Sequence, residues 1–279
     1  MSGTPVGRIT GATLLGGIVG NPVSHSLSPV IHNAWLEAGG IDGAYVAFAP
    51  KDAAGFEALV AAGRAGLVAG LNVTAPFKEQ AFALVDEAAA AAQMTGSANI
   101  LVFEDGRVRA DSADGAGMLY ALAEQAPKLK LNGASVVMLG AGGAARAGAG
   151  ALIEAGAALS ILNRTRERAE ALAADLGPAV SVAPDAGVLE GADLVINALS
   201  VAPDVSLAAL KPSAVVMDMT YKPVVTPLLA AARARGLTTV DGLAMLIGQA
   251  APSFEAIFRR PPPPLDLRAL LLSHLGETA

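Results

Sequence analysis

Residues 135–168 read SVVMLGAGGAARAGAGALIEAGAALSILNRTRER, and this stretch indicates the fold of the second half of the chain. The run from Ser135 to Leu139 is short, apolar and rich in valine, which is typical of a strand buried on both faces. The glycines at 140 and 142 allow a tight turn after that strand. Ala145 is small enough for the following helix to pack closely against it. The stretch therefore predicts a strand, a glycine turn and a helix in succession.

The second half of this stretch points to a nucleotide ligand. A helix that starts near Gly143 directs free N–H groups and the positive end of its dipole at a pyrophosphate. After the strand expected at 159–162, folds that prefer NAD usually place an acidic residue, whereas this chain has Asn163-Arg164-Thr165. A guanidinium beside small polar groups suits the 2′-phosphate of NADP. The residues predict NADP as the cofactor; the alternative is an ordinary crossover whose arginine-rich helix start is only solvated.

The composition excludes several other classes of protein. With 279 residues, of which 53% are hydrophobic and 4% aromatic, the chain can bury a large core made mainly of Ala, Val and Leu. The formal charge of −6 argues against non-specific nucleic-acid binding. The absence of cysteine excludes disulfides and thiolate metal sites and agrees with a cytoplasmic location. The three histidines have no metal-ligand spacing, so no metal is expected.

The start of the chain carries no targeting or membrane signal. Met1–Gly7 lacks the basic start and apolar core of a signal peptide. The longest stretch without Asp, Glu, Lys or Arg is 9–36, and Asn21-Pro22 and Ser24-His25-Ser26 interrupt it. We therefore expect neither a leader nor a membrane span.

Alternating strand and helix patterns predict an α/β fold for the N-terminal part. Its βαβ-like order implies a mostly parallel sheet with helices around it. The expected strands are 14–19, 44–48, 67–73, 99–103 and 108–110. The expected helices run from Ser28 to the Gly39-Gly40 stop, over 52–64, from Lys78 to about Ala92, and over 114–124.

From Ser135 the same alternation predicts a doubly wound nucleotide-binding sheet. Its six strands are expected at 135–139, 159–162, 179–182, 193–197, 214–219 and 237–240. Helical patterns over 242–258 and 265–275 close the chain. We predict an N-terminal α/β substrate domain over 1–113 and a Rossmann-type NADP-binding domain over 114–241. The C-terminal helices of 242–279 are expected to return to the substrate domain.

Two charged residues stand where a site is expected. Lys78 follows a strand and a proline turn, at the edge where open α/β sheets bind ligands, and a lysine held there can act as an acid or base. The alternative is a surface lysine in a first helical turn, a position that disfavours a cation. Asp114 offers a carboxylate at the next strand-to-helix junction, although an ordinary N-cap would also explain it.

Four polar residues are weaker candidates. Ser26 and Ser28 can hydrogen-bond a carboxylate or polyhydroxylated ligand, but taken alone they are better explained by capping at Ser28 and turn formation at Ser26. Tyr221 follows a strand end, and Gln249 lies on a predicted helix. A polar surface accounts for Gln249 as well as a ligand site does.

Together these motifs resemble those of the shikimate dehydrogenase family, in family order from about residue 14 to residue 254. The matching segments are Ser24–Pro29 with His32-Asn33, Asn72–Lys78, Ala98-Asn99, Asp114-Gly115, Gly140–Ala145, Asn163–Thr165, Asp218–Pro223, and Asp241–Leu246 with Gln249. The resemblance implies reversible reduction of 3-dehydroshikimate to shikimate with NADPH, a step of chorismate and aromatic amino acid biosynthesis. It implies small-molecule ligands, no nucleic acid or membrane, and a monomer or homodimer.

The resemblance also implies the site residues. Lys78 and Asp114 would form the catalytic acid–base pair. The substrate would be held by Ser26, Ser28, Thr74, Asn99, Tyr221 and Gln249. The cofactor would be held by Gly140, Ala141, Gly142, Gly143, Ala144, Asn163, Arg164, Thr165, Arg168, Gly242 and Met245.

Three positions depart from the family pattern. Ile100 and Ala113 stand where the family usually has threonine near the substrate, and Leu199 stands where it has threonine near the cofactor. These departures leave open a paralogue that acts on quinate or a related cyclohexane acid. A non-catalytic ligand sensor on the same scaffold is a further alternative, against which the retention of Lys78 and Asp114 argues.

Overall fold

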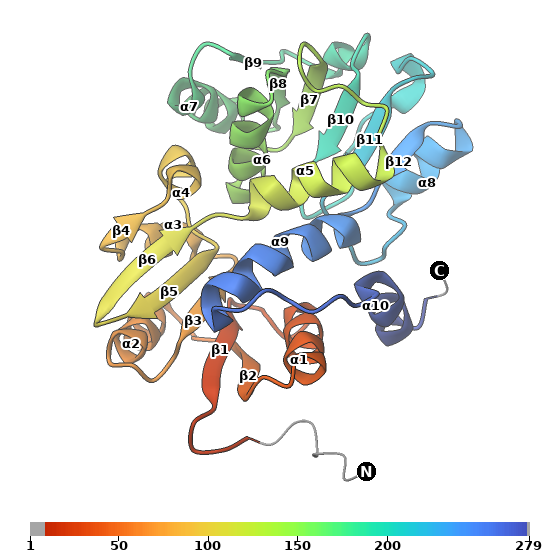
Figure 1. The fold of residues 1–279 in the computed structure, drawn as a ribbon. Helices are drawn as coiled ribbons and strands as arrows, with labels where there is room; N and C mark the ends of the chain where they lie inside the picture. The colour runs from red at the N-terminus through yellow and green to blue at the C-terminus, as the bar shows by residue number, and fades with distance from the viewer. Residues whose placement is uncertain (1–8, 278–279) are drawn as a thin grey trace. The chain divides into compact units, whose positions relative to one another are not determined.

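The computed structural model describes residues 9–277 (Figure 1). The segment Met1–Gly7, on which the expectation about a leader rests, lies outside them. The chain divides into two compact units. The first unit consists of the residues up to Ala113 and those from Gln249 onward, and the second unit is Asp114–Gly248. No helix within 9–277 has the length and apolar character needed to cross a membrane.

The first unit contains a six-stranded mixed sheet in the order β2-β1-β3-β5-β6-β4 (Figure 1). Pairs β1–β2, β1–β3 and β4–β6 are parallel, whereas β3–β5 and β5–β6 are antiparallel. The hairpin turns at Asp105-Gly106, whose φ angles of 49° and 76° suit a tight two-residue turn. The strands are β1 (Leu14–Val19), β2 (Gly43–Phe48), β3 (Gly70–Val73), β4 (Glu87–Ala88), β5 (Ile100–Glu104) and β6 (Arg107–Asp111).

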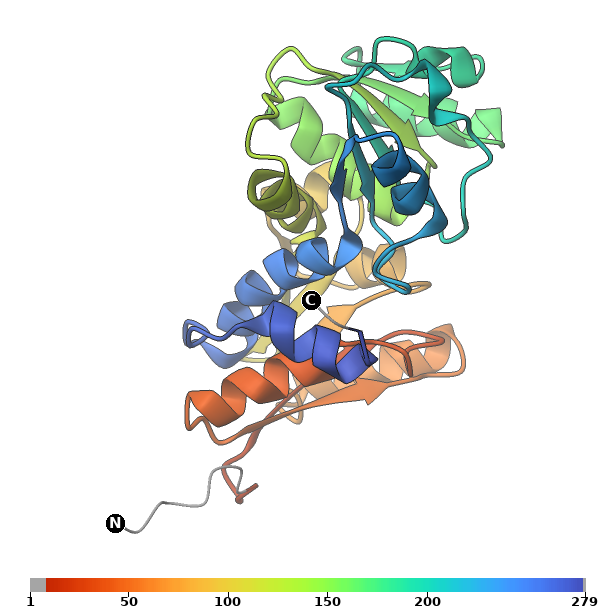
Figure 2. The same cartoon turned by 90° about the vertical axis from the view of Figure 1, so that its right-hand side faces the viewer.

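Helices cover this sheet, and α10 packs beside α1 (Figures 1 and 2). The helices are α1 (Ser28–Ala38), α2 (Ala53–Arg64), α3 (Lys78–Ala83), α4 (Ala90–Thr95) and α10 (Leu267–Leu275). A further helix, α9 (Gly242–Phe258), contributes its residues from Gln249 onward to the first unit. Asp52 caps α2 and Asp266 caps α10, each by accepting a backbone hydrogen bond.

Two expectations about the first unit are wrong. The helix predicted from Lys78 to about Ala92 is two short helices, α3 and α4, with β4 between them. Asp86 causes the break, because its carboxylate accepts hydrogen bonds from Arg64 and from the backbone N–H of Val108. The strand predicted at 67–73 begins only at Gly70, and the side chain of Leu67 is 68% exposed.

The second unit contains an all-parallel sheet in the order β12-β11-β10-β7-β8-β9 (Figure 1). Numbered within the unit, this is the order 3-2-1-4-5-6 of a doubly wound fold, so the predicted fold class is confirmed. The strands are β7 (Ser135–Leu139), β8 (Ala158–Leu162), β9 (Val180–Val182), β10 (Leu194–Asn197), β11 (Val215–Asp218) and β12 (Thr238–Val240). The α-helices are α5 (Asp114–Gln125), α6 (Gly143–Glu154), α7 (Arg166–Leu176) and α8 (Pro227–Ala234), with 3-10 turns η1 (Ala186–Leu189) and η2 (Leu207–Ala209).

Strand β7 shows why this sheet needs cover on both faces. Val136 and Met138 point into one hydrophobic cluster, while Val137 and Leu139 point into another. All four side chains are at most 2% exposed. A continuous apolar run is the pattern of a strand buried on both sides, as the sequence indicated.

Candidate active site

The second unit reverses its strand order between β7 and β10, the position where open α/β sheets bind ligands. Gly140 follows β7 with φ of 112°, a backbone conformation that residues with side chains rarely adopt. A Cβ at this position would also lie 3.0 Å from the side chain of Leu199, in the loop after β10. The turn after β7 therefore requires glycine both for its conformation and for its packing.

The N-terminus of α6 is open to a ligand. Gly142 is its N-cap, and no side chain caps the helix. A Cβ added at Gly142 or Gly143 would meet no atom of residues 9–277 within 4 Å. Ala141 and Ala144, in the same turn, are partly exposed. Uncapped N–H groups at the start of a 12-residue helix suit the pyrophosphate of a dinucleotide.

The segment after β8 suits a phosphate on the adenosine ribose. Asn163 Nδ2 donates to the carbonyl oxygen of Thr165 over 2.7 Å and shapes the loop. Arg164 is exposed, and its guanidinium forms no hydrogen bond or ion pair within the described residues. Arg166, by contrast, is paired with Glu170 over 2.7 Å. Arg164 is thus available to bind the 2′-phosphate of NADP.

A buried carboxylate fixes the ends of β10 and β11. Asp218 accepts hydrogen bonds from Asn197 Nδ2 (3.1 Å), the N–H of Thr220 (3.0 Å) and Thr226 Oγ1 (2.7 Å). A cavity of about 250 Å³ lies over these residues. Tyr221 follows directly and is partly exposed. This rigid edge adjoins the turn that begins at Gly140.

Three other predicted cofactor residues have different surroundings. A Cβ at Gly242 would lie 2.4 Å from the carbonyl oxygen of Met219, so this position also requires glycine. Met245 is 6% exposed and belongs to the hydrophobic core of the second unit. Arg168 is exposed on the first turn of α7.

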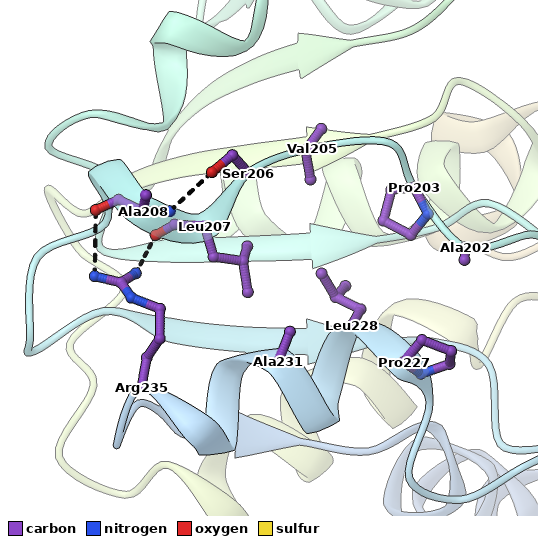
Figure 3. A pocket seen from close by; sticks show the side chains of 10 residues that line it. All are labelled: Ala202, Pro203, Val205, Ser206, Leu207, Ala208, Pro227, Leu228, Ala231 and Arg235. Atoms are coloured by element: carbon purple, nitrogen blue, oxygen red, sulfur yellow. Dashed lines mark hydrogen bonds between the residues drawn. The ribbon is translucent and has the colours of Figure 1, made fainter.

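Figure 3 shows a second cavity of the same unit, which is mainly apolar. It lies between the 202–208 segment and α8, and its volume is about 370 Å³. The guanidinium of Arg235 donates to the carbonyl oxygens of Leu207, Ala208 and Leu210. Arg235 is the one charged residue among the described residues that line this cavity, and its guanidinium is hydrogen-bonded to backbone carbonyl oxygens. This cavity is therefore not a candidate for the polar chemistry of the site.

In the first unit, Lys78 is partly buried and opens α3. Its carbonyl oxygen accepts a hydrogen bond from the N–H of Ala98 over 3.0 Å, so the start of α3 lies beside Asn99. Thr74 precedes it, at the end of β3, and packs against Gly20. Asp114, which is 5% exposed, opens α5 in the second unit. The acid–base pairing of Lys78 with Asp114 stays a prediction.

Asn99 and Gln249 are brought together although they are far apart in the sequence. Asn99 Nδ2 donates to Gln249 Oε1 over 3.1 Å, and Asn99 Oδ1 accepts from the N–H of Ala113 over 2.8 Å. Asn99 is 3% exposed. The first unit thus places a lysine and two amides on neighbouring segments. No three His, Asp or Glu side chains of residues 9–277 gather as a metal site would require.

The prediction that Ser28 caps α1 is wrong. The N-cap is Leu27, no side chain caps the helix, and Ser28 is already its first residue. The side chain of Ser28 instead lies beside the hydroxyl of the buried Tyr45 and offsets part of the rise that burial causes in the pKa of that tyrosine. Ser26 has the turn role that was expected as an alternative, because its Oγ accepts from the N–H of Ser28 over 3.2 Å. Capping therefore does not explain Ser28.

Sequence reasoning gave no role to Tyr45, Asn72 or Ser253. The Tyr45 hydroxyl donates to Asn72 Oδ1, and Asn72 Nδ2 donates to Ser253 Oγ, each over 2.8 Å. The sequence signal that could have indicated them is a polar side chain within an otherwise apolar strand. Tyr45 lies in the strand GAYVAF, and Asn72 lies in the strand GLNV.

His32 lies in an aromatic cluster beside this network. It is 1% exposed and stacks on Tyr45, with ring centroids 4.1 Å apart and planes 6° apart. Trp35 and Phe254 lie 5.8 Å from it, centroid to centroid. Burial lowers the pKa of His32 to about 3, and its Nδ1 has no hydrogen-bond partner in the described structure. His32 is therefore neutral in the folded protein at physiological pH.

Ile100 and Ala113, the two departures expected near the substrate, belong to one hydrophobic cluster. Ile100 is 2% exposed and Ala113 is 4% exposed. With Val102 they form a small hydrophobic cluster against Ala256. Neither position offers a hydrogen-bonding side chain.

Comparisons with known proteins agree with this architecture. The family model described as shikimate dehydrogenase substrate binding domain matches residues 18–101, and the model described as shikimate / quinate 5-dehydrogenase matches residues 121–226. A shikimate dehydrogenase (NADP(+)) of Caulobacter vibrioides is 50% identical over 281 residues, covering 96% of this chain and 98% of that protein. The chain belongs to the shikimate dehydrogenase family. The family predicted from the sequence is confirmed.

Solved structures of the family share the fold at lower identity. Shikimate 5-dehydrogenase of Thermus thermophilus, in complex with NADP(H) and shikimate, is 34% identical with a TM-score of 0.82. The match covers 90% of this chain and 95% of that one. Quinate dehydrogenase of Corynebacterium glutamicum, in complex with NAD, is 30% identical with a TM-score of 0.85, covering 94% and 99% of the two chains. The family thus includes members named for either substrate and bound to either cofactor.

Proposed function

We propose that this protein is an NADP-dependent dehydrogenase that interconverts shikimate and 3-dehydroshikimate. The observation that carries the proposal is the grouping of Lys78 with Asn99 and Gln249 in one unit of a chain that belongs to this family. An amine that can exchange a proton then lies near amides that can bind hydroxyls. The second unit offers the dinucleotide-binding turn. We assign the substrate to the first unit and NADP to the second.

The residues that would hold NADP form one edge of the second unit. Gly140 to Gly143 and the start of α6 would bind the pyrophosphate, and Asn163, Arg164 and Thr165 the 2′-phosphate. Ala141, Ala144, Arg168, Gly242 and Met245 complete the proposed cofactor set. Bound NADPH supplies the hydride for reduction of the carbonyl group.

The chain's own residues supply orientation and a proton. Ser26, Ser28, Thr74, Asn99, Tyr221 and Gln249 would hold the carboxylate and hydroxyls of the substrate. In the direction of reduction, Lys78 donates a proton to the carbonyl oxygen, and in the reverse direction it accepts the proton of the alcohol. Asp114 would orient the ammonium group and share the proton. Such general acid–base catalysis typically contributes about 10²–10⁴-fold to the rate.

Arg164→Ala is expected to raise the KM for NADP by about tenfold or more and to leave the KM for NAD nearly unchanged. A charge-assisted hydrogen bond to the 2′-phosphate is worth roughly 1.5–3 kcal/mol, and NAD has no such phosphate. Initial-rate kinetics with each cofactor give the measurement. Arg166→Ala, which removes a guanidinium paired with Glu170, is the matched control. Equal losses for both cofactors in the Arg164 variant would assign that residue a role in folding instead.

The protein is expected to prefer shikimate to quinate by at least about tenfold in kcat/KM. Substrate choice is expected to depend on the polar groups of Ser26, Ser28 and Asn99, because such a site rejects an analogue that leaves one of them without a partner. A buried hydroxyl without a partner weakens binding. Oxidation of the two acids by NADP, measured side by side, tests both the activity and the preference. A higher kcat/KM for quinate would favour the paralogue, and activity with neither acid would favour the sensor.

A cytoplasmic location and a monomeric or dimeric state remain predictions from the sequence. Size-exclusion chromatography with light scattering measures the second of these directly.

A further inference from the structure

A series of partly buried hydrogen bonds in the first unit connects residues assigned to the substrate. The Tyr45 hydroxyl donates to Asn72 Oδ1 over 2.8 Å. Asn72 Nδ2 donates to the carbonyl oxygen of Asn99 over 3.1 Å and to Ser253 Oγ over 2.8 Å. Ser253 Oγ in turn donates to the carbonyl oxygen of Gln249 over 3.0 Å. Asn72 and Ser253 therefore bind the backbone carbonyl groups of Asn99 and Gln249, the two residues whose side-chain amides belong to the candidate site.

Tyr45 extends this series to the start of α1. Its hydroxyl lies beside the side chain of Ser28, which offsets part of the rise that burial causes in the pKa of Tyr45. Tyr45 and Asn72 thus lie between Ser28 on one side and the Asn99–Gln249 pair on the other. Polar groups that are partly shielded from water lose free energy when they give up a partner, so each member of the series restricts the orientation of the next.

Packing holds the Tyr45 ring independently of its hydroxyl. The residue is 2% exposed, and its ring stacks on His32 with centroids 4.1 Å apart. Removing only the phenolic oxygen leaves this stacking in place. The hydroxyl can therefore be tested without disturbing the aromatic cluster.

We infer that Tyr45 and Asn72 are positioning residues for the substrate, which hold Ser28, Asn99 and Gln249 in one fixed arrangement. The inference rests on the proposed function. A ring carboxylate with several hydroxyls must meet all its partners at the same time, and binding is tightest when those partners are already in place. Tyr45 and Asn72 supply this arrangement through Ser28 and the two amides, without a substrate contact being assigned to them.

Tyr45→Phe is expected to raise the KM for shikimate by about fivefold, while the KM for NADP stays within about twofold of the wild-type value. The variant should still fold, since the ring remains, but with a lower unfolding temperature, because Asn72 Oδ1 loses the hydrogen bond from the Tyr45 hydroxyl. Tyr120→Phe, at a tyrosine of α5 that is 46% exposed, is the matched control and should change neither constant. Ser253→Ala tests the other end of the series and should raise the KM for shikimate in the same selective way.

A double variant separates positioning from independent effects. When Tyr45→Phe is combined with Ser28→Ala, the loss of kcat/KM for shikimate should be smaller than the product of the two single losses. The reason is that Ser28→Ala removes the hydroxyl group that Tyr45 is proposed to position. Multiplicative effects, an unchanged KM for shikimate, or parallel increases in both KM values would overturn the inference. If the wild-type protein does not oxidise shikimate, the proposed function fails and the inference fails with it. If the wild-type protein oxidises shikimate and the Tyr45→Phe variant has the wild-type KM for shikimate, the positioning role is refuted while the proposed function stands.

Discussion

Lys78→Ala is expected to lower kcat for shikimate oxidation by about two orders of magnitude or more. The proposed mechanism requires a group that accepts the proton of the alcohol as hydride leaves, and Lys78 is the residue assigned to this role. The hydrogen bonds that join Asn99 to Gln249 and Ala113 to Asn99 do not use the Lys78 side chain. The variant should therefore fold and bind NADP normally, as fluorescence titration with the cofactor would show.

Lys51→Ala is the matched control, because Lys51 is an exposed lysine of the same unit. It should retain wild-type turnover. The alternative assignment, a solvated lysine at a helix start, predicts normal kcat for Lys78→Ala and a change in unfolding free energy of at most about 0.5 kcal/mol. Near wild-type turnover across the accessible pH range would remove Lys78 from the mechanism.

The wild-type protein is expected to lose about 2 kcal/mol of unfolding free energy between pH 7 and pH 5 because of His32 alone. Its pKa is lowered by burial from the ordinary 6.5 to about 3 in the folded state. The unfolded chain therefore binds a proton below pH 6.5, whereas the folded chain does not. The contribution of His32 to stability is fully present above pH 6.5 and is lost as the pH falls from there toward 3.

His32→Phe should abolish this loss, so that the acid dependence of the variant is shallower by the same amount. The substitution retains an aromatic ring beside Tyr45 and removes an Nδ1 atom that has no partner in the described structure. Urea unfolding followed by the fluorescence of Trp35, the single tryptophan of the chain, reports on this unit directly. His274→Gln, on the exposed side of α10, is the control. Identical acid losses in wild type and His32→Phe would contradict the prediction.

The sequence was sufficient for the doubly wound sheet and for the glycine turn after β7. Both depend on local patterns, namely short apolar strands in regular alternation with helices and glycines at fixed spacing after β7. It was insufficient for the 78–92 segment, where the pairing of β4 with β6 and the contacts of Asp86 overrule a helical pattern. Tertiary pairing of this kind leaves no periodicity in the sequence.

The same distinction applies to the site. Lys78, Asn99 and Gln249 could be chosen because they lie in recognisable motifs. The hydrogen bonds of Asn72 and Ser253 could not be predicted, because the two residues are separated by 181 positions. Taken alone, each of these polar residues has an ordinary structural explanation. Ser28 was misassigned as a cap because the boundary of α1 lies one residue earlier than its sequence signature indicates.

The first unit is assembled from the two ends of the chain, and this has a consequence for synthesis on the ribosome. All of Asp114–Gly248 emerges before the residues that supply Ser253 and Phe254 to the first unit. Until then, the nascent N-terminal segment lacks a hydrogen-bond partner of Asn72 and an aromatic neighbour of Trp35. The second unit can therefore complete its core during translation before the first unit acquires these contacts with Ser253 and Phe254.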